Sequence, residues 1–436
     1  MGAIIHRAIM PAMPAFQFSD PPPDSLAFAL LNAAHIVEAV LQGQSLADGL
    51  LARVPAIARP GVQDGVYGCL RQYGRGDFFL GHLLERPLAL PAVRSLLLVS
   101  LYRLESRLDS AHTVVDQAVQ AAGQIAGGRF KGLVNGVMRN FLRRRESLLD
   151  ALARDPVSSH SHPGWWLQHL QAAYPQVWPA IVAAGNSPPP MALRVNGRRT
   201  TVAACLRQLE ERGFTASARG EAGLLLERPV PVEQLPGFAA GHVSVQDLGA
   251  QRAATLLDPA PGSRVLDACA APGGKTAHLL ERADLDLLAL DLKPARCRRI
   301  EENLSRLGLE ARVRAADAAR TGQWWDGHPF DAVLADVPCT ASGVVRRHPD
   351  AKWLRREDDI RSFARTQSAL LEALWPVVKP GGKLLYATCS VFPEENSLQM
   401  DGFAARHPEV LRGHEEQLLP DAEHDGFYYC LLEKPL

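Results

Sequence analysis

The stretch Cys269–Thr276, which reads CAAPGGKT, has residue types that could bind a ligand through the backbone. Its last four residues end like the phosphate-binding loop G-x-x-x-x-G-K-[ST]. This chain has Cys269 where that loop has its first glycine, and a side chain there disfavours the positive φ that glycine adopts. Asp336 could imitate the magnesium-binding carboxylate of a triphosphate site. We nevertheless favour a glycine turn that serves a different ligand.

Four aspartates fall where parallel strands are predicted to end. Asp267 and Asp291 end two successive apolar segments, Asp317 follows a third, and Asp336 ends the segment DAVLAD. Ligands of parallel α/β sheets bind at the carboxyl ends of the strands, and a carboxylate after the second strand can accept ribose hydroxyls. The helix after the glycine turn offers N–H groups to a carboxylate. We therefore expect an S-adenosylmethionine site, with Asp291 at the ribose and Asp317 near the adenine. The amino-acid end would contact Cys269, Ala270, Ala271, Pro272, Gly273, Gly274 and Lys275.

Two cysteines follow two of the predicted strands, Cys339 in DVPCTASG and Cys389 in YATCSV. If those strands are neighbours, their ends lie about 5 Å apart, and both thiols can face one substrate. Either cysteine alone would be interpreted as a small apolar residue in the core.

Two thiols beside a methyl donor suggest chemistry on cytosine. Carbon 5 of cytosine is a poor nucleophile, but addition of a thiolate at carbon 6 makes it enamine-like and able to attack a methyl group. Loss of the carbon 5 proton and elimination then free the enzyme, so one thiol would attack and the other assist release. Asp336 could hydrogen-bond the polar edge of the base. Such a base must be single-stranded or flipped out of a helix.

Strand and helix patterns alternate from about residue 240 onward, which predicts a doubly wound, mostly parallel sheet. One expected helix, PARCRRIEENLSRLG, has Cys297 on its apolar face, so we predict that this cysteine is buried. The chain is thus expected to be multidomain, with a C-terminal Rossmann-like methyltransferase domain over residues 239–436.

The first part of the chain reads as helix from about residue 24 to 148. VRSLLLVSLYRLE is apolar almost all round and suits a central helix, and Asp109 or Ser110 could cap the helix after it. Arg143–Arg145 could complement a helix C-terminus or contact an RNA backbone. We place a flexible tail at residues 1–22 and an all-α domain at 23–150.

Residues 151–238 are expected to form a linker and a small α+β module. ALRVNGRRT reads as strand and turn, TVAACLRQLEERGF as an amphipathic helix with Cys205 on its buried face, and SARGEAGLLLERPV as a strand.

Length and composition limit the number of domains, the cellular compartment and the kinds of partner that this chain can have. Its 436 residues predict several domains. The 47 basic and 47 acidic side chains balance, so the chain as a whole is not a polycation. Local patches such as Arg346-Arg347 could still contact phosphate. The seven scattered cysteines contain no C-x-x-C, which indicates a reducing cytoplasm and no metal site. No apolar run approaches a bilayer span. We expect no membrane and no DNA partner, and a monomer.

Four motifs together resemble the Nol1/Nop2/Sun family of RNA cytosine-5 methyltransferases: DACAAPGGKT, DLKPARCRR, DAVLADVPCTASG and LLYATCSVFPEEN. The resemblance implies that Cys389 is the nucleophile and Cys339 assists release, whereas DNA enzymes use the cysteine of the P-C motif as nucleophile. It also implies that Asp336 joins the residues that bind S-adenosylmethionine.

The layout of the whole chain resembles the bacterial Sun-type (RsmB-type) branch of that family, which methylates 16S ribosomal RNA. Its members have a NusB-like helical domain, and GLVNGVMRNFLRR is similar to the usual end of that domain. Transfer RNA is the second candidate substrate. Two different classes of protein stay open as well: a noncatalytic RNA-binding factor and, less favoured, an ATPase that uses Lys275 and Asp336.

Overall fold

The computed structural model describes residues 21–436, so the tail predicted at residues 1–22 lies almost wholly outside the described residues. The described chain forms two compact units. One contains residues up to 42, 47–69 and 76–149, and the other contains 43–46, 70–75 and 150–436. No helix among residues 21–436 is long and apolar enough to cross a membrane.

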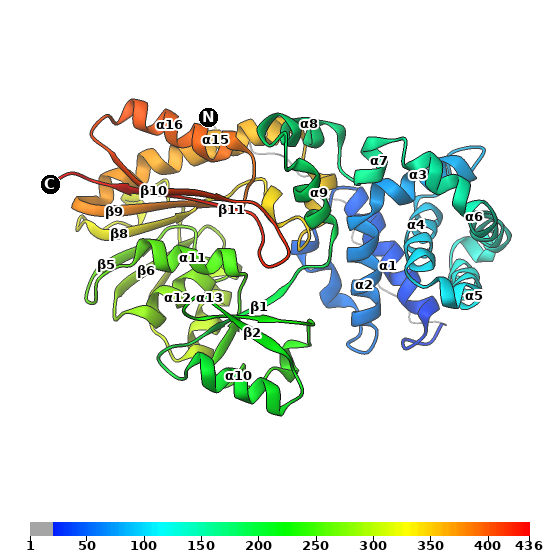
Figure 1. The fold of residues 1–436 in the computed structure, drawn as a ribbon, viewed down its shortest axis with the longest axis horizontal. Coiled ribbons are helices and arrows are strands. Elements are labelled where there is room, and N and C mark those ends of the chain that lie inside the picture. Colours follow the sequence, from blue (N-terminus) through cyan, green and yellow to red (C-terminus); the bar gives the residue numbers. More distant parts are fainter. Residues whose placement is uncertain (1–20) are drawn as a thin grey trace. The chain divides into compact units, whose positions relative to one another are not determined.

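The first unit is helical, as the apolar periodicity predicted. Helix α4, the apolar VRSLLLVSLYRLE segment, is buried along most of its length and packs against α1 and α5 (Figure 1). The side chain of Ser25 caps α1 by accepting a hydrogen bond from the backbone N–H of Phe28. The helices of this part of the chain are α1 Leu26–Leu41, α2 Arg59–Arg71, α3 Tyr73–Leu83, α4 Pro91–Ser106, α5 Ala111–Ala122 and α6 Lys131–Leu152.

Two details of this unit differ from the sequence-based expectation. Ser110 occupies the N-cap position of α5, but its side chain makes no capping hydrogen bond. Helix α6 continues to Leu152, so Arg143–Arg145 lie before its last turn and cannot complement the C-terminal dipole as predicted. Arg143 and Arg144 are exposed, and their contact with RNA stays a prediction.

From residue 150 onward, the second unit continues with three short helices and a small four-stranded antiparallel sheet. The sheet has the order β2-β3-β1-β4, and α10 (Val202–Glu211) covers it. Cys205 on this helix is buried, as predicted, together with Leu209. The segment read as one strand, SARGEAGLLLERPV, is a hairpin of two strands. The elements are α7 Pro156–His160, α8 Gly164–Ala173, α9 Trp178–Asn186, β1 Met191–Val195, β2 Ala216–Arg219, β3 Gly223–Leu226 and β4 Val243–Val245.

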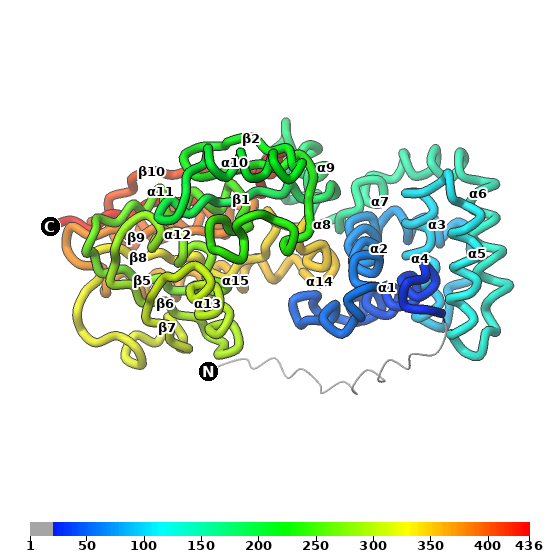
Figure 2. Tube along the Cα trace, turned by 90° about the horizontal axis from the view of Figure 1, so that it is seen from below, coloured from blue at the N-terminus to red at the C-terminus, as the bar shows by residue number. Residues whose placement is uncertain are grey.

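The rest of the unit is the predicted doubly wound sheet, with the order β10-β11-β9-β8-β5-β6-β7. Strands β9 to β7 are parallel, and β11 and β10 are antiparallel additions at one edge. Figure 2 shows β9, β8, β5, β6 and β7 in this order. The strands are β5 Arg264–Asp267, β6 Asp286–Asp291, β7 Arg312–Ala315, β8 Phe330–Asp336, β9 Val378–Thr388, β10 Leu411–Leu418 and β11 Phe427–Glu433.

Helices cover both faces of this sheet, as the mostly apolar central strands require. Helices α11 (Leu248–Leu257), α12 (Gly274–Arg282) and α13 (Pro294–Leu307) bury their apolar faces in one core. Helices α15 (Glu357–Leu374) and α16 (Ser397–Arg406) contribute to the core on the other face. Cys297 is buried, as predicted.

Two segments that precede residue 150 belong to this second unit. Its short helix α14 (Ala351–Leu354) contacts both. The Nε1 of Trp353 donates to the carbonyl of Leu70 at 2.7 Å, and the Nζ of Lys352 donates to the carbonyl of Arg71 at 2.9 Å. The Oγ of Ser45 donates to Asp350 at 2.9 Å, at the start of the same helix.

Candidate functional site

The topological switch point of the large sheet lies between β5 and β8. The chain runs outward from β5 to β6 and β7, then returns to β8 on the other side of β5. The carboxyl ends of these two strands carry Asp267 and Asp336. This is the edge of an open α/β sheet where ligands bind.

The glycine turn after β5 is held by backbone hydrogen bonds. The N–H of Ala270 donates to the carbonyl of Leu290 at 2.8 Å, and the N–H of Gly273 donates to Ala270 at 2.7 Å. The peptide bond between Ala271 and Pro272 is cis. Gly273 has φ of +94°, and a Cβ there would meet the Cα of Ile300 at 3.1 Å. Both features of Gly273 require glycine, and the close approach brings the turn against α13.

Lys275, in the first turn of α12, reaches the end of β8. Its Nζ donates to Oδ2 of Asp336 at 2.7 Å. Burial lowers the pKa of Lys275, but Asp336, together with Cys389 and Asp267, outweighs that effect. The net shift is upward, so the ammonium stays charged. One oxygen of Asp336 is thus committed to Lys275, and the other is available to a ligand.

Asp267 is fully buried at the end of β5. Its Oδ2 accepts a hydrogen bond from Thr276 at 2.6 Å, whereas its buried Oδ1 has no partner within the described structure. Burial raises the pKa of Asp267 to about 7, and the nearby Asp336 and Asp291 add to the shift. An unpartnered acceptor beside the glycine turn suits a ligand that carries hydrogen-bond donors.

Asp291 and Asp317 lie at the ends of neighbouring strands, as predicted. The backbone N–H of Ala316 donates to the carbonyl of Asp291 at 3.0 Å, which ties the two ends together. The carboxylate of Asp291 is 3 % exposed and approaches Arg296 at 3.4 Å, whereas that of Asp317 is 38 % exposed. These carboxylates offer acceptors to hydroxyl groups on the same edge as the glycine turn.

Cys339 and Cys389 lie side by side, because β8 and β9 are neighbouring parallel strands. Their sulfur atoms are 3.3 Å apart. Cys339 is buried and Cys389 is partly exposed. The hydrogen bond with Cys389, together with burial, raises the pKa of Cys339 well above its ordinary value, so Cys339 keeps its proton at neutral pH.

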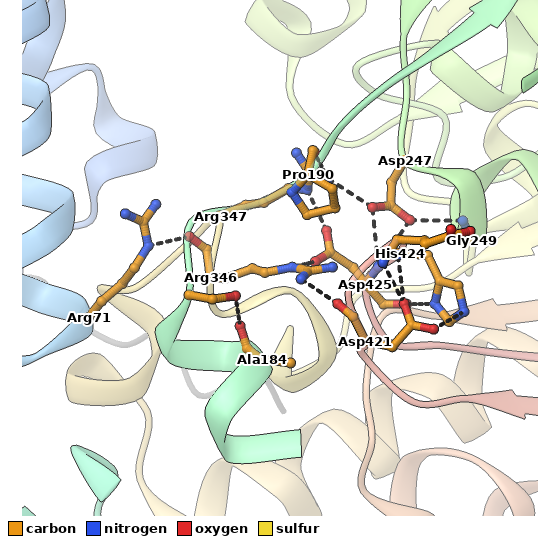
Figure 3. Close-up of polar contacts among 12 residues, drawn as sticks. Arg71, Ala184, Pro190, Asp247, Gly249, Arg346, Arg347, Asp421, His424 and Asp425 are labelled. Carbon is orange, nitrogen blue, oxygen red and sulfur yellow. Dashed lines mark hydrogen bonds and ion pairs between the residues drawn. The ribbon is translucent and has the colours of Figure 1, made fainter. Parts of the chain in front are cut away.

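Arg346 and Arg347 do not form the surface patch for phosphate contact that the sequence suggested. The side chain of Arg346 is 2 % exposed and that of Arg347 is 27 % exposed, and both pair with the buried carboxylate of Asp425 (Figure 3). Arg347 also donates to Asp247 at 2.8 Å. Both arginines are already neutralised, and Arg346 is shielded from solvent, so the sequence-based expectation was wrong for this pair.

One group at the site was missed by sequence reasoning. Glu395 is fully buried and hydrogen-bonds to the loops that follow both cysteines. Its position six residues after Cys389, in PEEN, is the only sequence signal that could have identified it.

Comparisons with known proteins agree with this geometry. The family model of the 16S rRNA methyltransferases RsmB/F matches residues 254–433. The ferredoxin-like domain of RsmF/B-like methyltransferases matches residues 162–233, and the NusB family matches residues 25–143.

Two curated relatives match nearly the whole chain. Ribosomal RNA small subunit methyltransferase B of Vibrio cholerae is 44% identical over 92% of this chain and 96% of its own length. The protein of that name from Pseudomonas putida is 45% identical, over 93% and 98%.

Solved structures share the fold. The crystal structure of PH0851 covers 95% of this chain and 100% of its own, at 24% identity and a TM-score of 0.78. A methyltransferase homologue from Pyrococcus horikoshii covers 64% of this chain and 98% of its own, at 29% identity and a TM-score of 0.57.

The doubly wound sheet and its strand-end glycine turn and carboxylates define a Rossmann-like methyltransferase domain, preceded by a NusB-like helical region. The chain belongs to the RsmB/F family of 16S rRNA methyltransferases.

Proposed function

We propose that this protein transfers a methyl group from S-adenosylmethionine to carbon 5 of a cytosine in 16S ribosomal RNA, through a covalent cysteine adduct at carbon 6. The observation that carries the proposal is the pair of thiols 3.3 Å apart beside the switch point. One buried thiol could be a packing residue, but two in contact at the ligand edge suit addition to a base followed by elimination.

The roles of the two cysteines follow from exposure and proton affinity. Cys389 is partly exposed, so it can reach carbon 6 and form the carbon–sulfur bond as a thiolate. Cys339 is buried and holds its proton, because its hydrogen bond with Cys389 and its burial raise its pKa. It is therefore the poorer nucleophile and lies where it can assist the elimination that returns Cys389 to the free enzyme.

Asp336 is suited to bind the cytosine ring during this addition. Its oxygen bonded to Lys275 is fixed at 2.7 Å, and its second oxygen can accept a hydrogen bond from the polar edge of the base. Stabilisation of the protonated ring by this carboxylate makes carbon 6 more susceptible to the thiolate.

The strand-end residues fit S-adenosylmethionine, which supplies an electrophilic sulfonium methyl group when bound. The tight turn at 269–275 brings backbone groups close to a ligand, and the unpartnered oxygen of Asp267 offers an acceptor. Asp291 would accept from ribose hydroxyls, and Asp317 would lie near the adenine.

The choice of RNA rests on the relatives, which are named as small-subunit ribosomal RNA methyltransferases. Transfer RNA is the second candidate substrate. Action in the cytoplasm as a monomer, without a DNA partner, belongs to the same proposal.

A trapping experiment tests the reaction. Cys339→Ala protein, mixed with S-adenosylmethionine and unmodified small-subunit RNA, should give a slow band on a denaturing gel that both protease and ribonuclease remove. The band should vanish in the Cys339→Ala/Cys389→Ala double variant. If the single variant gives no band and wild-type protein leaves this RNA unmethylated, the ribosomal assignment fails, and transfer RNA is assayed in the same way.

A further inference from the structure

The loop that carries Cys339 is held on both sides of the cysteine by one pair of buried side chains. Oε1 of Glu395 accepts from the backbone N–H of Thr340 at 2.9 Å, and Oε2 accepts from the Thr340 hydroxyl at 2.5 Å. Gln367 donates at 3.0 Å both to Oε1 of Glu395 and to the carbonyl of Pro338. The residues before and after Cys339 are therefore fixed to the same carboxylate system.

The loop that carries Cys389 is tied to the same carboxylate. The hydroxyl of Ser390 donates to Oε2 of Glu395 at 2.5 Å. The backbone N–H of Gly343 donates to the carbonyl of Cys389 at 2.9 Å, which connects the two cysteine loops directly. Glu395 is thus a side chain whose carboxylate bonds to both loops.

The burial of the Glu395 carboxylate makes its hydrogen bonds to the two cysteine loops costly to break. Its side chain is fully buried, and its hydrogen-bond donors Thr340, Gln367 and Ser390 are all uncharged. Burial raises its pKa, and the hydrogen bonds from Ser390, Thr340 and Gln367 oppose that shift. A buried carboxylate is costly unless it is hydrogen-bonded. Three of its four donors come from the cysteine loops themselves, so moving these loops apart would remove hydrogen bonds from the buried carboxylate.

We propose that Glu395 is a positioning residue that sets the contact between the Cys339 and Cys389 sulfurs, which lie 3.3 Å apart. The roles of the sulfurs rest on the function proposed above, whereas their spacing does not. Glu395 itself bonds to neither sulfur.

The first measurement needs no RNA. Diamide, a mild azo oxidant, takes up two thiol protons and two electrons, becomes a hydrazine and leaves a disulfide between touching cysteines. Peptide mass spectrometry after timed exposure gives the rate of the Cys339–Cys389 cross-link. Glu395→Ala should slow this rate by about 10-fold, because the loops lose their shared acceptor, and Glu395→Gln, which keeps one acceptor oxygen, should slow it less.

The second measurement is methyl transfer to RNA. A misplacement of about 1 Å can cost about 100-fold in rate. Glu395→Ala should therefore lower kcat by about that factor, while KM for RNA and for the methyl donor change by less than about 3-fold. Glu395→Gln should recover part of the loss. Substitution of a residue needed only for folding would lower the yield of folded protein, but the folded fraction would keep the wild-type kcat.

Glu394→Gln is the matched control. Glu394 is the adjacent carboxylate, 36 % exposed, and it contacts His169 and neither cysteine loop. It should keep wild-type rates in both assays. Folded Glu395→Ala with unchanged cross-linking and unchanged kcat would overturn the proposal, and if that variant does not fold, wild-type behaviour of Glu395→Gln in both assays would do so. A wild-type protein that cross-links normally but does not methylate cytosine would overturn the proposed function alone.

Discussion

Arg194 and Glu281 form a two-point ion pair between the small sheet and the methyltransferase domain. Both nitrogen–oxygen contacts are 2.7 Å, and the side chains are 0 % and 3 % exposed. Arg194 lies on β1 and Glu281 on α12. The same guanidinium donates to the carbonyl of Gly274 at 2.8 Å, in the glycine turn. The small sheet therefore supports the turn that we expect to bind the methyl donor.

Replacing Arg194 with methionine should destabilise the protein strongly. Removal of one partner leaves Glu281 buried without its countercharge, which typically costs about 3–5 kcal/mol. Urea unfolding measures the free energy of unfolding. Arg252→Met is the control, because Arg252 pairs with Glu416 at 46 % exposure and should cost less than about 1 kcal/mol. Equal losses for the two variants would contradict the structural argument.

Gly273→Ala should weaken methyl-donor binding as well as stability. The positive φ alone costs an L-residue about 1–2 kcal/mol, and the new Cβ would also press on Ile300 at 3.1 Å. Gly262→Ala separates the two effects, because Gly262 has φ of +79° but nothing within 4 Å of its added Cβ. Calorimetric titration with S-adenosylmethionine should show lost affinity for Gly273→Ala only. Unchanged affinity would place the donor elsewhere.

Asp267 should make the protein less stable as the pH rises towards neutrality. Its folded pKa is about 7, above the value of about 4 in an unfolded chain. The folded state therefore holds the extra proton between these values. The stabilisation is fully present below pH about 4 and is lost as pH rises through about 7.

Unfolding measured in urea between pH 5 and 8 checks this expectation. Asp267→Asn should flatten the slope by up to about 1.4 kcal/mol per pH unit below pH 7. Asp286→Asn, at the exposed start of β6, should keep the wild-type slope. Parallel pH profiles for wild-type and Asp267→Asn protein would show that this carboxyl is ionised throughout.

Asp425→Asn should destabilise the loop after Cys339. The carboxylate pairs with Arg346 and Arg347, and the next residue, Gly426, donates its N–H to the carbonyl of Gly343 at 2.8 Å. Loss of its charge leaves Arg346 buried without a countercharge, at a cost of about 3–5 kcal/mol. Thermal unfolding should show the loss, whereas Asp401→Asn, which breaks the more exposed pair with Arg412, should change little.

Sequence patterns predicted the parallel part of the sheet and the residues at the carboxyl ends of its strands. Strand ends are marked by the switch from apolar residues to Asp, Gly or Cys, and neighbouring parallel strands bring such ends together. The sequence predicted the juxtaposition of Cys339 and Cys389 only if their two strands were neighbours, and the structure shows that β8 and β9 are. Strand β10 was missed because LRGHEEQL is a mostly exposed, polar edge strand with no apolar alternation.

The same sequence patterns did not predict which charged side chains are buried. Arg346-Arg347 reads as a solvated pair, and only the fold brings Asp425 to it from 78 residues further along the chain. Glu395 lies in a polar turn before α16, where a carboxylate normally faces water. Its burial depends on Thr340 and Gln367, which no pattern in the sequence groups with it.

Residues 43–46 and 70–75 belong to the second unit. This limits where the polypeptide can be shortened and when during synthesis the unit can fold. A protease cut or gene deletion at residue 150 would separate Leu70 and Arg71 from the groups on α14 that donate to them. The Nζ of Lys352 would lose a carbonyl acceptor in a fully buried place. During synthesis, both early segments must wait for their partners to leave the ribosome. Arg71 precedes Lys352 by 281 positions, and Ser45 precedes Asp350 by 305. Residues 43–46 and 70–75 are therefore part of the fold of the second unit, and a shortened chain that begins at residue 150 would lack them.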